Sequence, residues 1–393
     1  MTKMKTKKNK IMSAEFFFAL SYFLSSLIKP LLISNASRSS TILLGSTILL
    51  ILFSVFASRF LISKRKCKIF LIIVFVVSAF FVWDMIFRPN NLLGQYYYNF
   101  IIYGIIPLVM LLEVEDFEQV LYWWSFWAII VGIMYIADPL LGYQWMGGYM
   151  PYGFEAMLPA FSGACVIFFY YKKKCIMPLM ILFFAEIVIF ANKGAIITGA
   201  AVMIFTYLYS NNKQNVSWKK LWGVCSGIIV CFWQKNNILH FFIMLAKKIG
   251  IRSYSLITIE ESFNLQGGEF FIGRSNLWSN VWEYCKQHIF TGYGIGWMEE
   301  ITGNYAHNFF LDLISTFGII LSFFILIFLI VLLKKTIYNS NAFFKYFLLL
   351  IFLLWFFPLQ FSLTIWKTEA FWVFVGANLY MNNKCNFKVA KGD

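Results

Sequence analysis

The sequence predicts an all-α protein that crosses a membrane many times. Hydrophobic residues make up 60% of its 393 positions and charged residues only 13%, which is too little polar surface to cover a soluble globule. The apolar residues gather in runs long enough for a helix to cross a bilayer. Because no internal repeat or low-complexity linker separates these runs, we expect a single polytopic membrane domain over residues 1–393.

We expect about twelve membrane spans, with the first one retained in the mature protein. Lysines precede the apolar run at 16–33 as they would in a signal peptide, but the run is long and no clear small-residue cleavage site follows it. The expected spans are 16–33, 40–62, 69–87, 98–113, 119–138, 154–171, 175–191, 194–209, 219–235, 307–333, 342–361 and 365–381.

The positions of the basic residues give an independent prediction of topology. Most of the 33 lysines and arginines lie in the N-terminal segment, at 63–68, 172–174, 213–220 and 334–335, and in the tail after residue 384. If the N-terminus is cytoplasmic, the order of the spans puts all of these segments inside, as basic loops require. Both termini are therefore expected to be cytoplasmic. The net charge of +15 then reflects topology, and no nucleic acid is expected as a partner.

The same topology makes residues 236–306 one large extracytoplasmic loop between the ninth and tenth spans. Function in membrane proteins concentrates where ordered polar structure interrupts the apolar scaffold, so we expect the site here. The chain has no P-loop, no HExxH, no CxxC pair and no DxD element, so neither a nucleotide cofactor nor a metal is expected. Cys285 is the one cysteine placed clearly in the loop, which argues against a disulfide framework.

Three cations are candidates for binding an anionic substrate. Arg252 and Arg274 lie in the large loop, and their planar guanidinium groups suit bidentate binding of a diphosphate. Lys193 interrupts an apolar stretch between two expected spans. A lysine at that depth faces either an anion or a cavity, or else reaches to the outer interface, and the sequence leaves both readings open for Lys193.

Two local patterns describe the loop around Arg274. The apolar residues that follow it recur at helical spacing and predict a Trp-rich amphipathic helix along the outer bilayer surface: Leu277, Trp278, Val281, Trp282, Cys285 and Ile289. Gly292, Gly294 and Gly296 lack the strand and βαβ context of a dinucleotide loop. These glycines instead predict a tight turn that folds the loop back to the membrane.

His307 is the candidate general base. We expect Asn304 to cap the next helix, which would place His307 in its first turn, where the helix dipole favours the neutral imidazole. Asn308 and Asp312 are spaced by one helical turn and are candidates for orienting the ring. The alternative is a histidine that only forms a hydrogen bond at the membrane interface.

Three stretches of this region resemble the bacterial O-antigen polymerase and O-antigen ligase family: GRSNLW, HIFTGYGIG and AHNFFLDLISTFGII. The family shows an Arg-x-x-x-Trp element, a PLxGxGxG turn and an HNxxLxxxxxxG element. These elements match Arg274 and Trp278, then Gly292, Gly294 and Gly296, then His307, Asn308, Leu311 and Gly318. Arg252 looks like the other loop arginine of the family, and Asn192-Lys193-Gly194 resembles its SRG element.

The resemblance covers roughly residues 250–320 and departs from the family in two places. Lysine replaces arginine at position 193, which weakens bidentate phosphate binding there. The usual proline before the glycine turn is absent at 288–290. The first half of the chain agrees with the family only in being a stack of spans.

The resemblance implies a glycosyltransferase-C-like membrane enzyme of lipopolysaccharide biosynthesis in the bacterial inner membrane, with no metal or cofactor. Its substrate would be an undecaprenyl-diphosphate-linked oligosaccharide, presented by membrane lipid at the periplasmic face, and a chain-length regulator protein is a candidate partner. His307 would then act as base, with Arg252, Arg274 and Lys193 binding the diphosphate and Asn308 and Asp312 in support.

Three functions remain open at this stage. The HNFFLDLISTFGII form looks more like a polymerase, which joins repeat units, than like a ligase, which moves the glycan to lipid A core. A transporter or flippase for a lipid-linked glycan would also suit many spans and a few buried cations. Transporters, however, usually place ionisable groups near the bilayer midplane, whereas here they gather in one outer loop.

Overall fold

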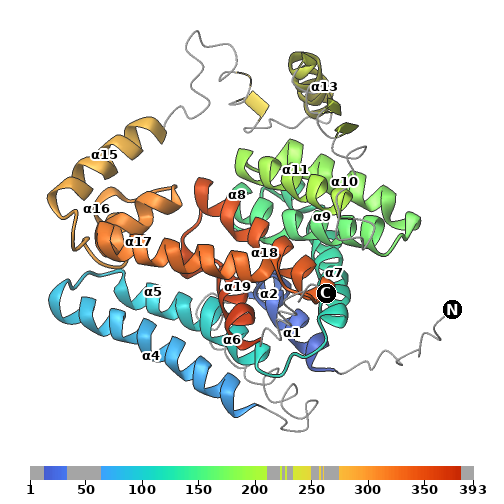
Figure 1. Ribbon diagram of the computed structural model, residues 1–393. Helices are drawn as coiled ribbons and strands as arrows, with labels where there is room; N and C mark the ends of the chain where they lie inside the picture. The colour runs from blue at the N-terminus through green and yellow to red at the C-terminus, as the bar shows by residue number, and fades with distance from the viewer. Residues whose placement is uncertain are drawn as a thin grey trace, which may run out of the picture.

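The structure is a computed structural model that describes residues 13–32, 63–209, 222–223, 226–227, 233–248, 256–257, 260 and 274–381. This part of the chain is all α-helical, with short 3-10 and π-helical segments (Figure 1). The principal α-helices are α1 (Ala14–Tyr22), α2 (Leu24–Leu32), α4 (Lys64–Phe87), α5 (Leu93–Phe100), α6 (Ile106–Leu111), α7 (Phe117–Tyr135), α8 (Tyr149–Pro151), α9 (Leu158–Cys165), α10 (Met177–Phe190), α11 (Lys193–Leu208), α13 (Lys235–Lys248), α15 (Arg274–Gln287), α16 (Trp297–Thr302), α17 (Phe309–Ile337), α18 (Ala342–Phe361) and α19 (Glu369–Tyr380).

Five helical segments of the described chain are long and apolar enough to cross a membrane. They are Lys64–Phe87, Phe117–Leu141, Tyr149–Tyr170, Phe309–Ile337 and Ala342–Phe361. The all-α fold is therefore confirmed for the described residues, and five of the twelve expected spans are long apolar helices there.

The other seven expected spans are not confirmed in the part of the chain that the structure describes. The run at 16–33 is two short helices, because the chain turns at Phe23 between α1 and α2. The runs at 175–191, 194–209 and 365–381 form α10, α11 and α19, which have 14, 16 and 12 residues. The run at 98–113 is divided among α5, the π-helical segment Ile101–Ile105 and α6. All of 40–62 and most of 219–235 lie outside the described residues.

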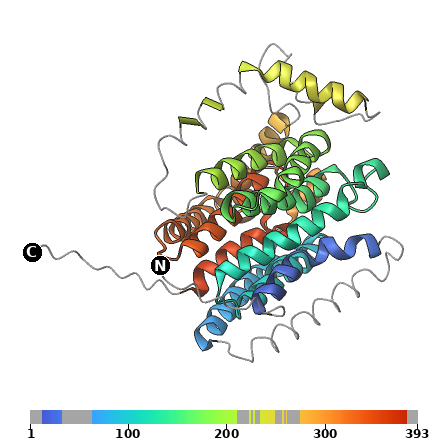
Figure 2. The ribbon, with the colours of Figure 1, turned by 90° about the vertical axis from the view of Figure 1, so that its right-hand side faces the viewer.

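The helices pack as a bundle with an apolar interior. Helix α7 packs chiefly on α9 and α1, whereas α18 packs on α11 and α19. Figure 2 shows the long helices lying roughly parallel, as expected for segments that cross one layer. Large aromatic side chains such as Trp124, Trp355 and Phe347 are fully buried between them. By contrast, Phe75 on α4 and Phe324 on α17 are 75% and 61% exposed, which suits contact with lipid.

Polar caps set where several helices begin. The side chain of Asn308 accepts hydrogen bonds from the backbone N–H groups of Phe310 and Leu311 and so starts α17. Asn192 caps α11 in the same way through Ala195 N, at 2.9 Å. Such caps satisfy N–H groups that have no partner within the helix. In both cases the capping residue adjoins a predicted site residue, His307 or Lys193.

Helix α17 is broken at Gly318, where the backbone has a φ of 75° and a ψ of 169°. The tight turn predicted at Gly292, Gly294 and Gly296 is confirmed, since all three glycines have positive φ angles. This turn lies against the break and pairs with the backbone groups that the break leaves free. The bonds run from Tyr293 N to Ser315 O (2.7 Å), from Gly294 N to Thr316 O (3.0 Å) and from Ile319 N to Ile289 O (2.7 Å).

The end of α4 fixes the other side of the glycine turn. Asp84 accepts a hydrogen bond from Ile295 N at 2.7 Å, and Asn90 donates its side-chain amide to Ile295 O at 2.8 Å. Arg88 donates to the carbonyl oxygens of Thr291 and Gly292. The turn is thus held between α4 and α17, and it fixes the C-terminal part of the large loop to these two helices.

Replacing Gly318 by alanine should destabilise the protein strongly. A Cβ at this position would lie 2.2 Å from the Phe290 carbonyl oxygen, and the backbone conformation is one that only glycine adopts readily. Strain alone is worth roughly 1–3 kcal/mol, so the midpoint of thermal unfolding in detergent should fall by several degrees.

Gly94→Ala is the matched control for this prediction. Gly94 lies in α5, has no φ in the left-handed region, and an added Cβ there meets no atom within 4 Å. Its thermal midpoint should stay level or rise slightly, because alanine favours the helix. Equal midpoints for Gly318→Ala and wild type would show that the break and the glycine turn do not stabilise each other.

Candidate functional site

The candidate site forms where α11, α15 and α17 begin and α18 ends. The residue that joins these elements is Phe361, the last residue of α18. Its carbonyl oxygen lies 3.0 Å from Nδ1 of His307, and its ring lies under the guanidinium of Arg274, 5.6 Å from ring centroid to Cζ. Gly194 packs against the side chain of Phe361 so closely that an added Cβ would come within 2.8 Å.

The structure therefore brings three of the four predicted reactive residues to one end of the bundle. His307 and Arg274 both contact Phe361, and Lys193 stands next to the glycine that packs on it. Arg252, the fourth, lies outside the described residues. Nothing in the sequence pattern had singled out Phe361, because its contacts come from elements far apart along the chain.

Arg274 is a half-buried cation and begins α15, the helix predicted from the apolar spacing. Val281 and Cys285 are buried in a small cluster with Met298 and Ala306, which fixes α15 against the chain that leads to α17. Within the described part of the chain, Arg274 has no hydrogen bond or ion pair to a carboxylate. Burial lowers the pKa of Arg274, yet arginine remains charged at any physiological pH. An unpaired buried cation of this kind favours an anionic ligand.

The expected cap at Asn304 is wrong. Asn308 is the cap of α17, so His307 stands just before the helix instead of in its first turn. The backbone of His307 has a φ of 49°, in the left-handed region that few residues other than glycine adopt. This strained position turns the chain out of the loop immediately before α17 and brings the imidazole to the end of α18.

His307 is neutral for a different reason from the one expected. Burial lowers its pKa from the usual 6.5, the charge of Arg274 lowers it further, and the Phe361 carbonyl and Glu299 act in the opposite direction. A carbonyl oxygen can only accept, so the neutral imidazole carries its proton on Nδ1 and donates it to Phe361. Nε2 is then left with a free lone pair, which makes it the atom able to take up a proton.

Asn308 and Asp312 lie close to His307 in sequence, but within the described residues neither side chain forms a hydrogen bond with the ring. The Asn308 oxygen is occupied by the start of α17. The carboxylate of Asp312 interacts electrostatically with Glu299 and Lys367. Their expected role in orienting the His307 ring therefore stays a prediction.

A second polar group adjoins His307 and was missed from the sequence. The ring of Tyr305 lies 4.4 Å from that of His307 between centroids, and the ammonium of Lys367 lies 5.7 Å from the Tyr305 ring. Lys367 forms an ion pair with Glu299 at 3.4 Å, and Glu299 accepts a hydrogen bond from the Tyr96 hydroxyl at 2.5 Å. The signal was present, because Lys367 and Glu369 are charged residues inside an otherwise apolar run.

Comparisons with protein-family models, with curated proteins and with solved structures find no match for this chain. The chemistry of the site is therefore read from its own residues. A neutral histidine with one free nitrogen stands beside an unpaired arginine, at the end of a helix bundle that suits a membrane. This arrangement can accept a proton from one group while it stabilises negative charge on another.

The charge of Arg274 should hold the pKa of His307 down. Arg274→Gln removes that charge and should raise the pKa of His307 toward the usual 6.5, so that the ring gains a proton at a higher pH than in the wild type. Histidine ring hydrogen–deuterium exchange, followed by mass spectrometry across pH, measures this pKa in the intact protein.

Lys286→Gln is the control for that measurement. Lys286 is on the same helix, is exposed and pairs with Glu283 at 2.7 Å. This variant should leave the pKa of His307 unchanged. An unaltered pKa in Arg274→Gln as well would mean that the two side chains are not electrostatically coupled.

Proposed function

We propose that this chain is a glycosyltransferase that joins undecaprenyl-diphosphate-linked repeat units at the outer face of the bacterial inner membrane. The observation that carries the proposal is the convergence of His307 and Arg274 on Phe361. One supplies a free base nitrogen and the other an unpaired positive charge. Glycosyl transfer from a lipid diphosphate needs both of these and takes its activation from the diphosphate itself.

The reaction follows from these two groups. An acceptor sugar hydroxyl attacks the anomeric carbon of the donor from the face opposite the diphosphate. Nε2 of His307 takes the hydroxyl proton as the new C–O bond forms. The bond from the anomeric carbon to the diphosphate breaks, and the lipid diphosphate leaves with the electron pair. Arg274 stabilises the growing negative charge, and the configuration at the anomeric carbon is inverted.

A lipid-linked substrate is supported by the place of the site at the ends of two long apolar helices. Helices α17 and α18 are both apolar enough to cross a membrane, and the site lies at the start of one and the end of the other. A lipid diphosphate presents its charge at headgroup depth, where Arg274 would meet it. Lys193 and Arg252 complete the proposed set of cations around the diphosphate.

The proposed topology keeps the twelve spans and the cytoplasmic termini expected from the basic loops. The site would then face the periplasm, where nucleotide-activated sugars are absent. A lipid-linked sugar suits that compartment, since it brings its own leaving group.

His307→Ala should abolish glycan chain growth, because no other described side chain at the site offers a neutral base nitrogen. We expect a surface polysaccharide of a single repeat unit, resolved by size on a gel, in cells that carry only this variant. His240→Ala is the matched control: this histidine is exposed on α13 and should leave the long ladder intact.

Other patterns on the same gel would select a different function. Bare core, with long glycan accumulating on the carrier lipid, would indicate a ligase. A full ladder in His307→Ala would refute the base assignment and favour a transporter.

A further inference from the structure

The ring of Tyr305 packs against the imidazole of His307. Their centroids lie 4.4 Å apart, and the two ring planes are inclined by 42°. A cation within about 6 Å of an aromatic centroid is attracted by the negative face of the ring. The phenol ring is therefore close enough to act on a positive charge that forms on the imidazole.

Tyr305 is held in this position by the segment that follows α18. A side-chain hydrogen bond joins Tyr305 to Ser362, the residue next to Phe361. The ammonium of Lys367 lies 5.7 Å from the centroid of the Tyr305 ring, and Lys367 is itself held by its ion pair with Glu299. The same short segment thus fixes two partners of the imidazole, the carbonyl that binds Nδ1 and the ring that packs against it.

The imidazole gains a positive charge when its Nε2 takes up a proton, and its surroundings act on that charge in both directions. Burial and Arg274 oppose the charged form of His307, whereas the Phe361 carbonyl and Glu299 favour it. Charged side chains from five segments lie at this end of the bundle: Lys193 on α11, Arg274 on α15, Glu299 on α16, Asp312 on α17 and Lys367 after α18. The opposing effects leave the resting ring neutral, so proton transfer benefits from a group that favours the charged ring.

We propose that Tyr305 is a positioning residue for the base: its ring holds the imidazole and stabilises the imidazolium that His307 forms when it takes the acceptor proton. The place of this contact in the reaction rests on the proposed function. The attraction between an aromatic face and the imidazole is weak while the imidazole is neutral and grows as the proton arrives. It therefore acts in the transition state more than in the resting enzyme. Arg274 keeps the base neutral beforehand, and Tyr305 offsets that charge during the transfer.

Fluorination of the ring tests the proposal with little change in its size. Tyr305 is replaced by phenylalanine and, through genetic code expansion, by trifluorophenylalanine, whose fluorines remove negative charge from the ring face. Tyr305→Phe should leave the pKa of His307 near its wild-type value, because the aromatic face remains. The fluorinated ring should lower that pKa by roughly 0.5 to 1, measured by histidine ring hydrogen–deuterium exchange.

A merely structural role for the ring would give a different result. Burial lowers the pKa of His307, so looser packing around the imidazole would admit water and raise the pKa. The two replacements at Tyr305 should have equal midpoints of thermal unfolding, because both fill the same space. An equal or higher pKa of His307 in the fluorinated variant than in Tyr305→Phe would overturn the proposal.

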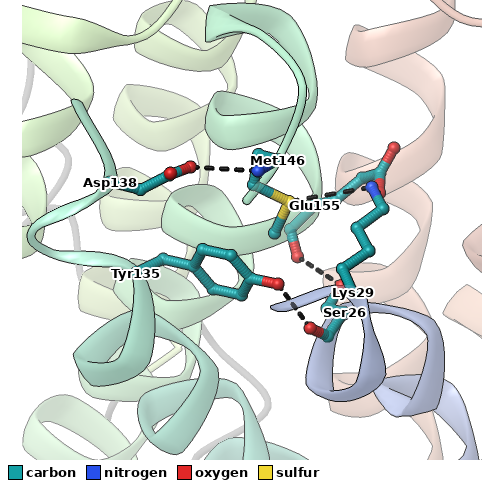
Figure 3. A network of polar contacts seen from close by, with 6 residues as sticks. All are labelled: Ser26, Lys29, Tyr135, Asp138, Met146 and Glu155. Carbon is teal, nitrogen blue, oxygen red and sulfur yellow. Dashed lines mark hydrogen bonds and ion pairs between the residues drawn. The ribbon is translucent and has the colours of Figure 1, made fainter. Parts of the chain in front are cut away.

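Tyr135 is the matched control, because its role is structural. Figure 3 shows its hydroxyl pointing at Ser26 of α2, to whose carbonyl oxygen it donates at 2.5 Å. Its ring packs on Trp145, at 6.2 Å between centroids. The same two replacements at Tyr135 should lower the midpoint of thermal unfolding, because they remove this buried hydrogen bond, and should leave the pKa of His307 unchanged. A fluorine effect on that pKa as large as the one at Tyr305 would also overturn the proposal.

Chain growth separates this inference from the proposed function. The fluorinated variant should have a lower kcat than Tyr305→Phe and the same KM for the lipid-linked repeat unit, because the imidazolium forms only after the substrate has bound. If His307→Ala sustains chain growth, the proposed function fails, and the pKa values still decide whether Tyr305 stabilises the charged ring. If His307→Ala stops chain growth and fluorination leaves the pKa unchanged, the inference about Tyr305 alone fails.

Discussion

The architecture depends on the pairing between the glycine turn and the break in α17. A helix that crosses a membrane cannot leave backbone groups unpaired, because lipid offers them no partners. Gly318 interrupts the ladder of α17, and the turn at Gly292 to Gly296 supplies the missing hydrogen bonds from outside the helix. The glycine turn is therefore attached to the bundle through the backbone of α17.

This pairing also explains how a chemically useful site arises from a loop. The turn is fixed against α17 and α4. The chain between Gly296 and Asn308 is short, so it must lead from this turn back to the N-terminal end of α17. His307 takes a left-handed conformation at that return and meets the last carbonyl of α18. The ends of several helices thus hold the imidazole and Arg274 on the same residue, Phe361.

The sequence predicted the apolar helices, the helix after Arg274 and the glycine turn, because local periodicity and spacing determine them. It could not predict that Phe361 joins the site or that Lys367 contacts Tyr305, since those contacts link distant segments. Hydropathy does not register turns such as Phe23 or short helices such as α19, so five of the described candidate spans, and not twelve, are long continuous apolar helices. The sequence placed the cap at Asn304 because asparagine is a favoured N-cap at either position, 304 or 308. The structure shows that Asn308 is the cap, because α17 begins at Phe309.

Reconstitution of the purified protein tests the central claim most directly. Vesicles containing the wild-type chain and lipid-linked repeat units, with no nucleotide sugar, should yield glycans longer than one repeat and release free undecaprenyl diphosphate. Both products should appear together, in proportion to the bonds formed. Repeat units that remain single beside folded protein, or glycan growth without release of the lipid diphosphate, would contradict transfer at the His307 and Arg274 site.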